Sequence, residues 1–572
     1  MKPDHGFFGW RRFTGRRGVP RRLPRWFARV LPAALFLAAC GPDDDPVADT
    51  GRDLAETVDD ASGLDGDADA PPPDVDAAAD AGPTDGDVGD DVVVGDLVPL
   101  YGTAEVELHA GTTYDGVSGT PNPFTDVTLV ADVVGPGGAS YEVEGFFDGD
   151  GAGGASGDVF RLRLFAATLG VWSWTTRSSL PALDGQSGAF TCRGALPGVF
   201  GQGPIDVDAA HPRSFRRRDG PAVYLLGKFL DVAAPAPIQY SHTFLSEELT
   251  DADREAMLAR HLGMRLNKLN VYLANRGDYR GVSTTPWVGT ADANDKRRFD
   301  LARWHGYDAW VVRLRDAGLL AQLWFFADDS GFGDLPDADR RLLLRYGMAR
   351  LSGYANTMFT LCLEWQEGWS TGEVEDHATY LQDHNPWSRL ASVHGTTGDF
   401  AFPTAAWADY LDIQSGNDAD PATVHAMGLA NRALAAKPLV NEEFGLGDED
   451  AAHRRKAWAA FVAGAAGSGT GAYLAHLAAF TELVAFERME PLDALAASGR
   501  AWVLAEPGVA LVAFLEQGGS VELDLSSFSG TLTARWYDPR TGSFSSAGGP
   551  VGGAVASFAA PNSEDWVLLV ER

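Results

Sequence analysis

Cysteine is scarce in this chain, and an excess of basic residues is absent. Only three of the 572 residues are Cys, and Cys192 and Cys362 fall in different predicted domains, so a disulfide framework is not expected. The formal net charge is −33, whereas phosphate binding needs a basic face, which excludes nucleic acid as a partner. The sequence also lacks three motifs: a nucleophilic Ser elbow, a Gly-rich phosphate loop after the first β/α strand, and a spacing of His and Asp typical of a catalytic metal. No cofactor or metal is therefore expected.

The first 39 residues have the pattern of a targeting segment. Residues 1–29 hold nine Lys or Arg and one acidic residue, and the apolar run 30–39 is too short to span a bilayer as a stable helix. The run ends Leu37-Ala38-Ala39-Cys40-Gly41, which resembles a bacterial lipobox in which the Cys40 thiol takes a diacylglycerol. An ordinary signal peptide with a chance Cys is the alternative. We expect residues 1–39 to be a lipoprotein signal peptide and Cys40 to anchor a cell-envelope protein in the outer membrane, periplasmic or surface-exposed.

Residues 40–96 are predicted to be a lipidated Cys followed by a disordered acidic tether. Positions 41–96 contain 19 Asp or Glu and a single Arg, with Ala, Gly and Pro between them. Such a segment cannot bury enough apolar surface to offset its ordering entropy, and its like charges keep it extended.

Residues 97–200 and 497–572 both predict β-sandwiches. Short alternating runs separated by Gly-rich turns indicate strands in the first domain at 104–108, 127–133, 141–149, 159–165, 170–176 and 188–192. In the last domain the same pattern indicates strands at 501–504, 509–515, 520–525, 532–537 and 565–570.

Residues 201–496 alternate strand-like and helical runs, which predicts parallel β/α units. Eight such units over this length are typical of a (β/α)8 TIM barrel; a doubly wound sheet is the alternative. The predicted strands are 222–226, 266–272, 320–326, 357–363, 389–393, 410–414, 438–442 and 471–474, and the predicted helices are 251–262, 301–317, 337–352, 421–435 and 450–466. The fold class is therefore multidomain, with a barrel flanked by two β-sandwiches.

Two predicted strands end in carboxylates. The fourth ends Leu363-Glu364-Trp365-Gln366-Glu367, and the seventh ends Val440-Asn441-Glu442-Glu443-Phe444. In a TIM barrel the active site lies at the C-terminal ends of the strands, so opposite strands can direct two carboxylates into one mouth. Glycosidic cleavage needs such a pair, one to protonate the leaving oxygen and one to attack carbon or activate water. A Glu on an exposed loop is, however, usually only solvated.

The three domains together resemble known bacterial proteins. Residues 98–200, with Asn122-Pro123-Phe124-Thr125-Asp126 and Leu169-Gly170-Val171-Trp172-Ser173-Trp174, resemble a sandwich that precedes many glycosidases. Residues 212–480 resemble the apiosidase-like barrel hydrolases, within a large retaining clan of glycosidases. Residues 498–572, with Trp536-Tyr537-Asp538-Pro539-Arg540-Thr541-Gly542, resemble a domain that is named for collagen binding and commonly ends those proteins.

The resemblance implies a role for each carboxylate. Glu364 takes the acid/base position of the clan, and Glu443, before an aromatic residue and Gly, takes that of the nucleophile. Glu367 and Glu442 are their rivals. The clan commonly has Asn just before the acid/base, where this chain has Leu363, and that Asn usually binds the sugar hydroxyl next to the reacting carbon.

Other strand ends supply candidate sugar contacts, because amide, indole and imidazole groups suit ligands rich in hydroxyls. Each of them taken singly is more often structural. The set is Asn270, Tyr272, Trp324, Asp328, Trp365, His394, Gln414, Asn441 and Tyr473. The sequence thus predicts a surface-anchored glycoside hydrolase of a poly- or oligosaccharide. The alternative is a non-catalytic carbohydrate- or matrix-binding lipoprotein.

Overall fold

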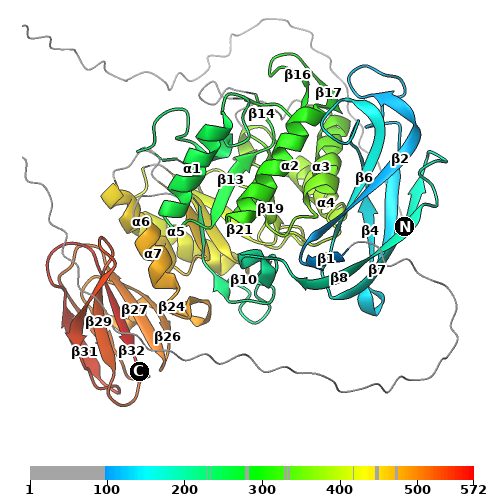
Figure 1. The fold of residues 1–572 in the computed structure, drawn as a ribbon. Helices are drawn as coiled ribbons and strands as arrows, with labels where there is room; N and C mark the ends of the chain where they lie inside the picture. The colour runs from blue at the N-terminus through cyan, green and yellow to red at the C-terminus, as the bar shows by residue number, and fades with distance from the viewer. Residues whose placement is uncertain are drawn as a thin grey trace, which may run out of the picture. The chain divides into compact units, whose positions relative to one another are not determined.

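The computed structural model describes residues 97–227, 230–231, 233–276, 283–327, 332, 335–416, 418–444, 450–469 and 474–572. These residues belong to one compact unit, 89–572, which contains several β-rich and β/α parts (Figure 1). The proposed signal segment, Cys40 and the acidic tether lie outside the described residues. Among the helices that are described, none is long and apolar enough to cross a membrane.

The N-terminal part is a two-sheet β-domain, as the alternating runs predict. One sheet has the order β1-β8-β7-β3-β4 and the other β2-β6-β5, and only the β1–β8 pair is parallel. The strands are β1 (Leu97–Leu100), β2 (Thr103–Asp115), β3 (Leu129–Val134), β4 (Ser140–Glu144), β5 (Phe146–Phe147), β6 (Ser156–Phe165), β7 (Gly170–Ser178) and β8 (Ser187–Ala195).

A small sheet follows, and then eight parallel strands in two sheets of four. The small sheet joins β9 (Ile205–Val207), β10 (Phe215–Arg217) and β11 (Ala222–Val223). The first parallel sheet has the order β13-β18-β19-β20 and the second β12-β23-β22-β21. Their bounds are β12 (Leu225–Gly227), β13 (Lys268–Tyr272), β18 (Leu320–Phe326), β19 (Thr357–Cys362), β20 (Ala391–Ser392), β21 (Leu411–Gly416), β22 (Leu439–Phe444) and β23 (Gly467–Gly469).

Backbone contacts link the edges of these two sheets. The N–H of Asn267, just before β13, donates to the carbonyl of Leu226 in β12 at 3.0 Å. At the other junction, His394 just after β20 forms an isolated parallel bridge with Asp412 of β21. The eight strands therefore follow one another in chain order, an arrangement consistent with a TIM barrel domain.

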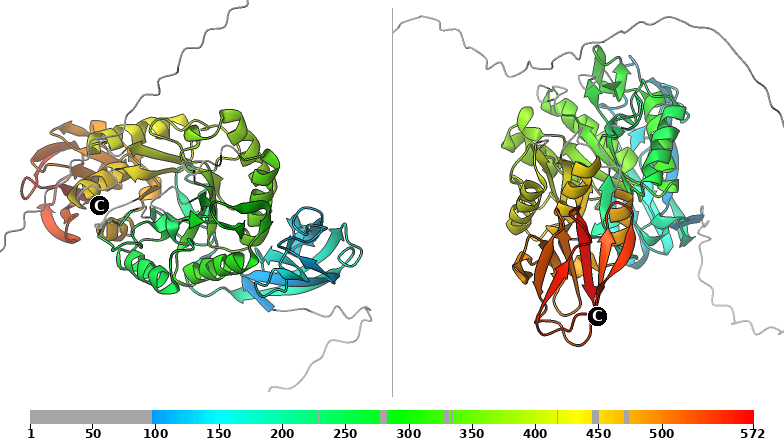
Figure 2. Two further views of the ribbon diagram at one scale, coloured as in Figure 1. Left: turned by 90° about the horizontal axis from the view of Figure 1, so that it is seen from above. Right: turned by 90° about the vertical axis from the view of Figure 1, so that its left-hand side faces the viewer.

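Helices lie around the outside of the parallel strands in the view from above (Figure 2). Several begin at side-chain caps that the sequence supplies: Thr250 accepts from the Asp253 N–H, Asp300 from Arg303 and Asp420 from Thr423. The helices are α1 (Asp251–Gly263), α2 (Leu301–Asp316), α3 (Asp337–Leu351), α4 (Thr371–Asp383), α5 (Pro421–Leu434), α6 (Asp450–Val462) and α7 (Leu474–Thr481). Two hairpins, β14–β15 (Asn275–Arg276, Ser283–Thr284) and β16–β17 (Trp287–Gly289, Asn294–Phe299), extend the loop regions.

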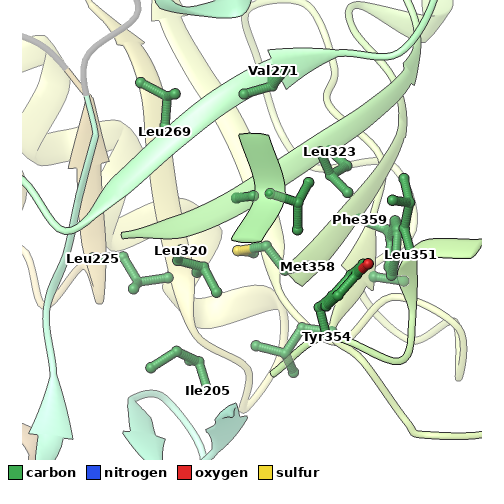
Figure 3. Packing of buried hydrophobic residues seen from close by; sticks show 14 of the residues in the cluster. Ile205, Leu225, Leu269, Val271, Leu320, Leu323, Leu351, Tyr354, Met358 and Phe359 are labelled. Atoms are coloured by element: carbon green, nitrogen blue, oxygen red, sulfur yellow. The ribbon is translucent and has the colours of Figure 1, made fainter. Parts of the chain in front are cut away.

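Side chains of the parallel strands alternate between two environments. Leu269 and Val271 of β13, with Leu323 and Phe359 of the next strands, belong to the main apolar cluster (Figure 3). The residues between them, such as Lys268 and Asn270, are polar and equally buried. This period of two places one apolar face against the helices and leaves a polar interior face.

The C-terminal part is a second two-sheet β-domain, again as predicted. Its sheets have the orders β24-β26-β27-β32-β29-β30 and β25-β28-β31. The strands are β24 (Glu490–Pro491), β25 (Ala496–Ser498), β26 (Trp502–Glu506), β27 (Ala510–Leu515), β28 (Ser520–Asp524), β29 (Thr533–Asp538), β30 (Ser543–Gly548), β31 (Val555–Ala559) and β32 (Trp566–Glu571).

Buried ion pairs join the β-domains to helices of the central part. Arg163 of β6 makes a bidentate contact with Asp308 of α2 at 2.7 and 2.8 Å, and Arg350 of α3 donates to the same carboxylate. Arg454 of α6 makes a bidentate contact with Asp565, just before β32, at 2.7 and 2.8 Å. In both contacts the two N–H groups of the Arg side chain match the two oxygens of the carboxylate, which fixes how the paired side chains are oriented.

Candidate active site

A buried polar network fills the interior of the parallel strands. Lys268 donates to Gln322 at 2.6 Å and forms an ion pair with Glu442. Gln322 in turn donates to Thr360 at 2.9 Å, to Tyr410 at 3.2 Å and to Asp412 at 3.3 Å. These six residues come from β13, β18, β19, β21, β22 and the position before β21, and we call them the interior network. Their contacts tie five strands together beneath the strand ends.

The interior network holds two carboxyl groups in different states. Glu442 receives the Lys268 ammonium and a hydrogen bond from Asn270 at 3.1 Å, so its charge is compensated. Burial, followed by the negative charge of Glu442, raises the pKa of Asp412 well above its ordinary value. The protonated form of Asp412 is therefore favoured relative to an ordinary aspartate, as expected when two acids share one cation.

Glu364 lies directly after β19 in a conformation that few non-glycine residues adopt. Its φ is 38° and its ψ 53°, in the left-handed region. Such a backbone costs about 1–3 kcal/mol and is concentrated at sites where surrounding contacts enforce it. One such contact is the hydrogen bond from the Glu364 N–H to Nδ1 of His394, at 3.3 Å. The side chain of Glu364 accepts a hydrogen bond from the amide of Gln414 at the end of β21.

Glu443 lies opposite the same glutamine in the sheet. In the β21–β22 ladder Ile413 pairs with Asn441, whereas Gln414 pairs with Glu443, so Glu442 is the extra residue of a β-bulge. A bulge interrupts strict alternation and re-aims a side chain, and such bulges are frequent at barrel rims and beside active sites. Gln414 therefore links the two candidate carboxylates, one by a hydrogen bond and the other by strand register.

An arc of aromatic and imidazole rings leads up to Glu364. His242 contacts Tyr272 with ring centroids 4.6 Å apart, Tyr272 contacts Trp324 at 6.0 Å, and Trp324 contacts His394 at 5.3 Å. His242 lies in the short 3-10 helix η3 (Ser241–Thr243), and the others lie in or just after β13, β18 and β20. We call these four residues the ring arc.

Several buried polar atoms at this end lack a partner in the described part of the chain. They are Oδ1 of Asn270, Nε1 of Trp324 and Nε2 of His394. Burial, then the charge of Lys268, lowers the pKa of His394 to about 3, so the ring is neutral. Because Nδ1 accepts from Glu364, the proton lies on Nε2, which becomes a free donor. Buried unsatisfied groups at a strand end mark positions that a polar ligand can fill.

The structure thus brings together much of the predicted set. Glu364, Glu443, Asn270, Tyr272, Trp324, His394 and Gln414 all lie at the C-terminal ends of the parallel strands or in the turns after them. Asp328 and Tyr473 lie outside the described residues. The ring of Trp365 packs against Phe402 at 5.3 Å, and Asn441 donates to Ser415 at 2.6 Å.

The rival carboxylates occupy different places. Glu367 is exposed at the end of the 3-10 helix η5 (Trp365–Glu367), where its N–H donates to the Glu364 carbonyl at 2.9 Å. Glu442 is 1 % exposed and belongs to the interior network. Glu364 is half-buried and Glu443 is 6 % exposed, so both carboxylates are largely removed from solvent while part of each residue remains accessible.

Sequence reasoning missed His242, Lys268, Gln322 and Asp412. The last three are polar residues inside runs that are otherwise apolar, and a charged residue in a buried strand is itself a signal, since burial without a partner is costly. His242 follows β12 in a loop with no periodic pattern, and nothing in the local sequence distinguishes it.

Comparisons with known proteins cover the two ends of the chain and its fold. Residues 98–179 match the family described as "Domain of unknown function (DUF5060)", and residues 496–571 match "Putative collagen-binding domain of a collagenase". A comparison with curated protein sequences gave no match.

Several solved structures resemble most of the chain. A "putative glycoside hydrolase" from Bacteroides vulgatus shares 18 % identity with a TM-score of 0.67, over 83 % of this chain and 100 % of that one. A glycoside hydrolase of family 5 from the same organism shares 16 % with a TM-score of 0.55, over 65 % and 94 %. A third structure, described as "Glycoside hydrolase", shares 18 % with a TM-score of 0.53, over 65 % and 97 %. These structural neighbours are glycoside hydrolases, and at such identities the likeness establishes the multidomain fold.

Proposed function

We propose that this protein is a glycoside hydrolase in which Glu364 is the acid/base and Glu443 the nucleophile. The observation that carries the proposal is the position of Gln414, which donates to Glu364 and is the strand partner of Glu443. One residue of β21 thereby connects carboxylates from β19 and β22 at the same end of the parallel strands. Paired carboxylates at such a position are what glycosidic cleavage requires.

The proposal includes a closed (β/α)8 barrel as the catalytic domain, 201–496. The Asn267–Leu226 hydrogen bond and the His394–Asp412 bridge support closure of the two sheets. In a barrel the C-terminal strand ends form the active face, and that is where Glu364, Glu443 and the ring arc lie. Three structural neighbours described as glycoside hydrolases agree with this reading.

The chemistry follows from the two carboxylates. Glu364, as the acid, gives its proton to the glycosidic oxygen while a Glu443 oxygen bonds to the anomeric carbon and the leaving group departs. Water then attacks that carbon, Glu364 takes a proton from the water, and the bond to Glu443 breaks. The product keeps the anomeric configuration of the substrate.

The neighbouring groups suit these roles. Lys268 compensates the charge of Glu442, and the raised pKa of Asp412 favours its neutral form, so the interior network limits unpaired carboxylate charge near the strand ends. Asn270, Trp324 and His394 offer one acceptor and two donors that sugar hydroxyls can satisfy. Asp328, Trp365, Asn441 and Tyr473 complete the proposed set of substrate contacts.

We further propose that the enzyme is a cell-envelope lipoprotein. A signal peptide at 1–39, lipidation at Cys40 and the acidic tether at 40–96 would hold the folded domains, 97–200, 201–496 and 497–572, off the outer membrane. The substrate is a poly- or oligosaccharide, and the barrel resembles the apiosidase-like hydrolases. The match of residues 496–571 to a domain named for collagen binding supports the second candidate, a non-catalytic carbohydrate- or matrix-binding lipoprotein.

The test is a hydrolysis screen of the full chain on aryl glycosides and on plant, algal and bacterial polysaccharides. Glu364→Gln and Glu443→Gln should each abolish turnover, whereas the matched variant Glu367→Gln should retain it. Proton NMR of the first product should show retained anomeric configuration. Activity that survives Glu443→Gln but not Glu442→Gln would transfer the nucleophile to Glu442. No turnover together with polysaccharide or collagen binding would favour the second candidate.

A further inference from the structure

A cavity of about 640 Å³ lies away from the strand ends, in the C-terminal β-domain. Its walls come from the loops around β25, β26 and β27 and from Ala422 near the start of α5. Trp502, Arg500, Glu516 and Gln517 line it together with backbone of small residues. A volume of several hundred cubic ångströms is the size range of small-molecule and sugar-sized sites.

The cavity contains charged and amide groups without partners. Arg500, Glu516 and Gln517 make no hydrogen bond or ion pair with any residue that the structure describes. Glu516 is half-buried, and burial raises the pKa of its carboxyl, which the nearby charge of Arg455 and, to a smaller extent, that of Arg500 oppose. Arg500 and Gln517 are exposed, so a donor and an acceptor face one hollow without a protein partner in the described part of the chain, and a ligand can replace the water around them.

The aromatic wall is fixed in place. The indole of Trp502 stacks on His425 of α5, with centroids 4.8 Å apart and ring planes at 17°. His425 is held by Asp493 at 2.8 Å, and Asp493 also accepts from the Val503 N–H at 2.7 Å. Trp502 lines the cavity and remains half-exposed. A held indole gives a flat apolar surface that needs no ordering when a ligand arrives.

We propose that this cavity is a second carbohydrate-binding site, which takes a neutral segment of a glycan chain. The inference rests on the proposed function, because it assigns the cavity to the same class of substrate. A sugar ring can lay its C–H face on Trp502, while its hydroxyls donate to Glu516 and accept from Arg500 and Gln517. Among the described lining residues Arg500 is the one cation, against the carboxylates of Glu516 and Asp493, which disfavours a polyanion and favours a neutral ligand.

A collagen-like strand fits the cavity less well. Proline has no N–H, so a proline-rich chain offers carbonyl acceptors for Arg500 but few donors for Glu516. A half-buried carboxylate that loses its water on binding and gains no donor would weaken the complex. Hydroxyl groups, which donate and accept, meet both requirements.

The experiment is affinity electrophoresis of the full chain in the Glu364→Gln background, in gels that contain laminarin, galactomannan, arabinoxylan or hydroxyethyl cellulose. At least one gel should retard the protein, and Arg500→Ala and Glu516→Gln should each weaken that retardation at least tenfold in apparent Kd. Arg193→Ala is the matched control, because Arg193 is exposed on β8 and its replacement removes the same charge far from the cavity lining. Trp502→Ala should also weaken the retardation, and this variant is compared only if its Tm stays near that of the parent.

Several outcomes separate this proposal from the catalytic one. With Glu364 intact, Arg500→Ala should leave kcat/KM on an aryl glycoside unchanged while lowering turnover of the polymer. Retardation that Arg500→Ala weakens, without turnover of any substrate, would keep the cavity and reject the hydrolase. Three results would overturn the carbohydrate assignment. The first is no retardation in any gel, and the second is a loss of affinity in Arg193→Ala as large as in Arg500→Ala. The third is binding of a (Gly-Pro-Pro)10 peptide that Arg500→Ala abolishes.

Discussion

The side-chain amide of Gln414 donates a hydrogen bond to Glu364, while the backbone of Gln414 pairs with Glu443 on the next strand. The bulge at Glu442 sets this relationship, because without the extra residue the register of β22 would pair Gln414 with Glu442. A register shift of one residue moves each side chain to the opposite face of its strand, so it would exchange the orientations of Glu442 and Glu443. The geometry therefore makes Gln414 a positioning residue for Glu364.

Replacement of Gln414 by Leu, which has a similar volume, should lower kcat/KM roughly 10- to 100-fold. The reason is that loss of this hydrogen bond releases the Glu364 side chain, and misplacement of a catalytic group by about 1 Å can cost on the order of 100-fold in rate. Steady-state kinetics on an aryl glycoside measure the effect. Gln382→Leu, on the exposed face of α4, is the control and should keep parental kinetics. Parental kcat/KM in Gln414→Leu would remove the positioning role.

The ion pair between Lys268 and Glu442 predicts a strong asymmetry between single and double variants. Both side chains are at most 1 % exposed, so Lys268→Met leaves an unpaired buried charge and should cost about 3–5 kcal/mol of unfolding free energy. Lys268→Met combined with Glu442→Leu removes both charges and should recover much of that loss. Scanning calorimetry on the three proteins gives the answer. A Tm of Lys268→Met equal to that of the parent would show that the ion pair does not stabilise the fold.

The domain order and most strands could be predicted from alternation and turn residues, because buried strands have a clear period of two. The eighth parallel strand could not. Its predicted position, 471–474, lies mostly outside the described residues, and Leu474 begins α7. The strand that pairs with β12 and β22 is Gly467–Gly469, whose Gly-Ser-Gly sequence has no apolar side chain to produce a pattern.

Helix α4 was also missed, although its start is visible in the sequence. Ser370 and Glu373 form a capping box, with each side chain bonded to the other residue's N–H. At the site, the prediction found residues at strand ends but not the bulge at Glu442 or the buried cation Lys268. Both depend on pairing between distant strands, which local patterns do not encode.

Gly469 predicts a steric effect on the strand of Glu443. A Cβ at position 469 would lie 2.2 Å from the backbone carbonyl oxygen of Glu442, so Gly469→Ala must displace β22. Misplacement of catalytic groups by about 1 Å can cost on the order of 100-fold in rate. We expect kcat to fall by at least tenfold, measured on the best substrate of the screen. Gly372→Ala in α4, where a Cβ meets nothing within 4 Å, is the control. Equal kcat in both variants would show that β22 can yield without harm.

The Arg163–Asp308 contact predicts that the N-terminal β-domain stabilises the central part. Asp308 is 7 % exposed and accepts from both Arg163 and Arg350, so Asp308→Asn removes a charged acceptor from both, leaving Arg163 with Glu105 and Arg350 with Asp148. We expect a loss of about 1.5–3 kcal/mol, seen as a lower Tm. Asp316→Asn, at the exposed end of the same helix, should change Tm by no more than a degree or two. A parental Tm for Asp308→Asn would mean that the bridge has no stabilising role.

His394 predicts how stability depends on pH. Its pKa in the folded protein is lowered to about 3 by burial, whereas the unfolded chain takes up the proton near the ordinary value of about 6.5. Below that pH the unfolded state binds more protons, so stability falls as pH decreases from about 6.5 toward 3. At pH 5 this one residue should cost about 2 kcal/mol. Calorimetry at pH 7.5 and pH 5 should therefore show a smaller drop in Tm for His394→Gln than for the parent. For the exposed His109 a hydrogen bond to Asp158 raises the pKa, which gives the opposite sign, so His109→Gln should not reduce the drop. An equal drop in the parent and in His394→Gln would show that the buried ring does not resist protonation.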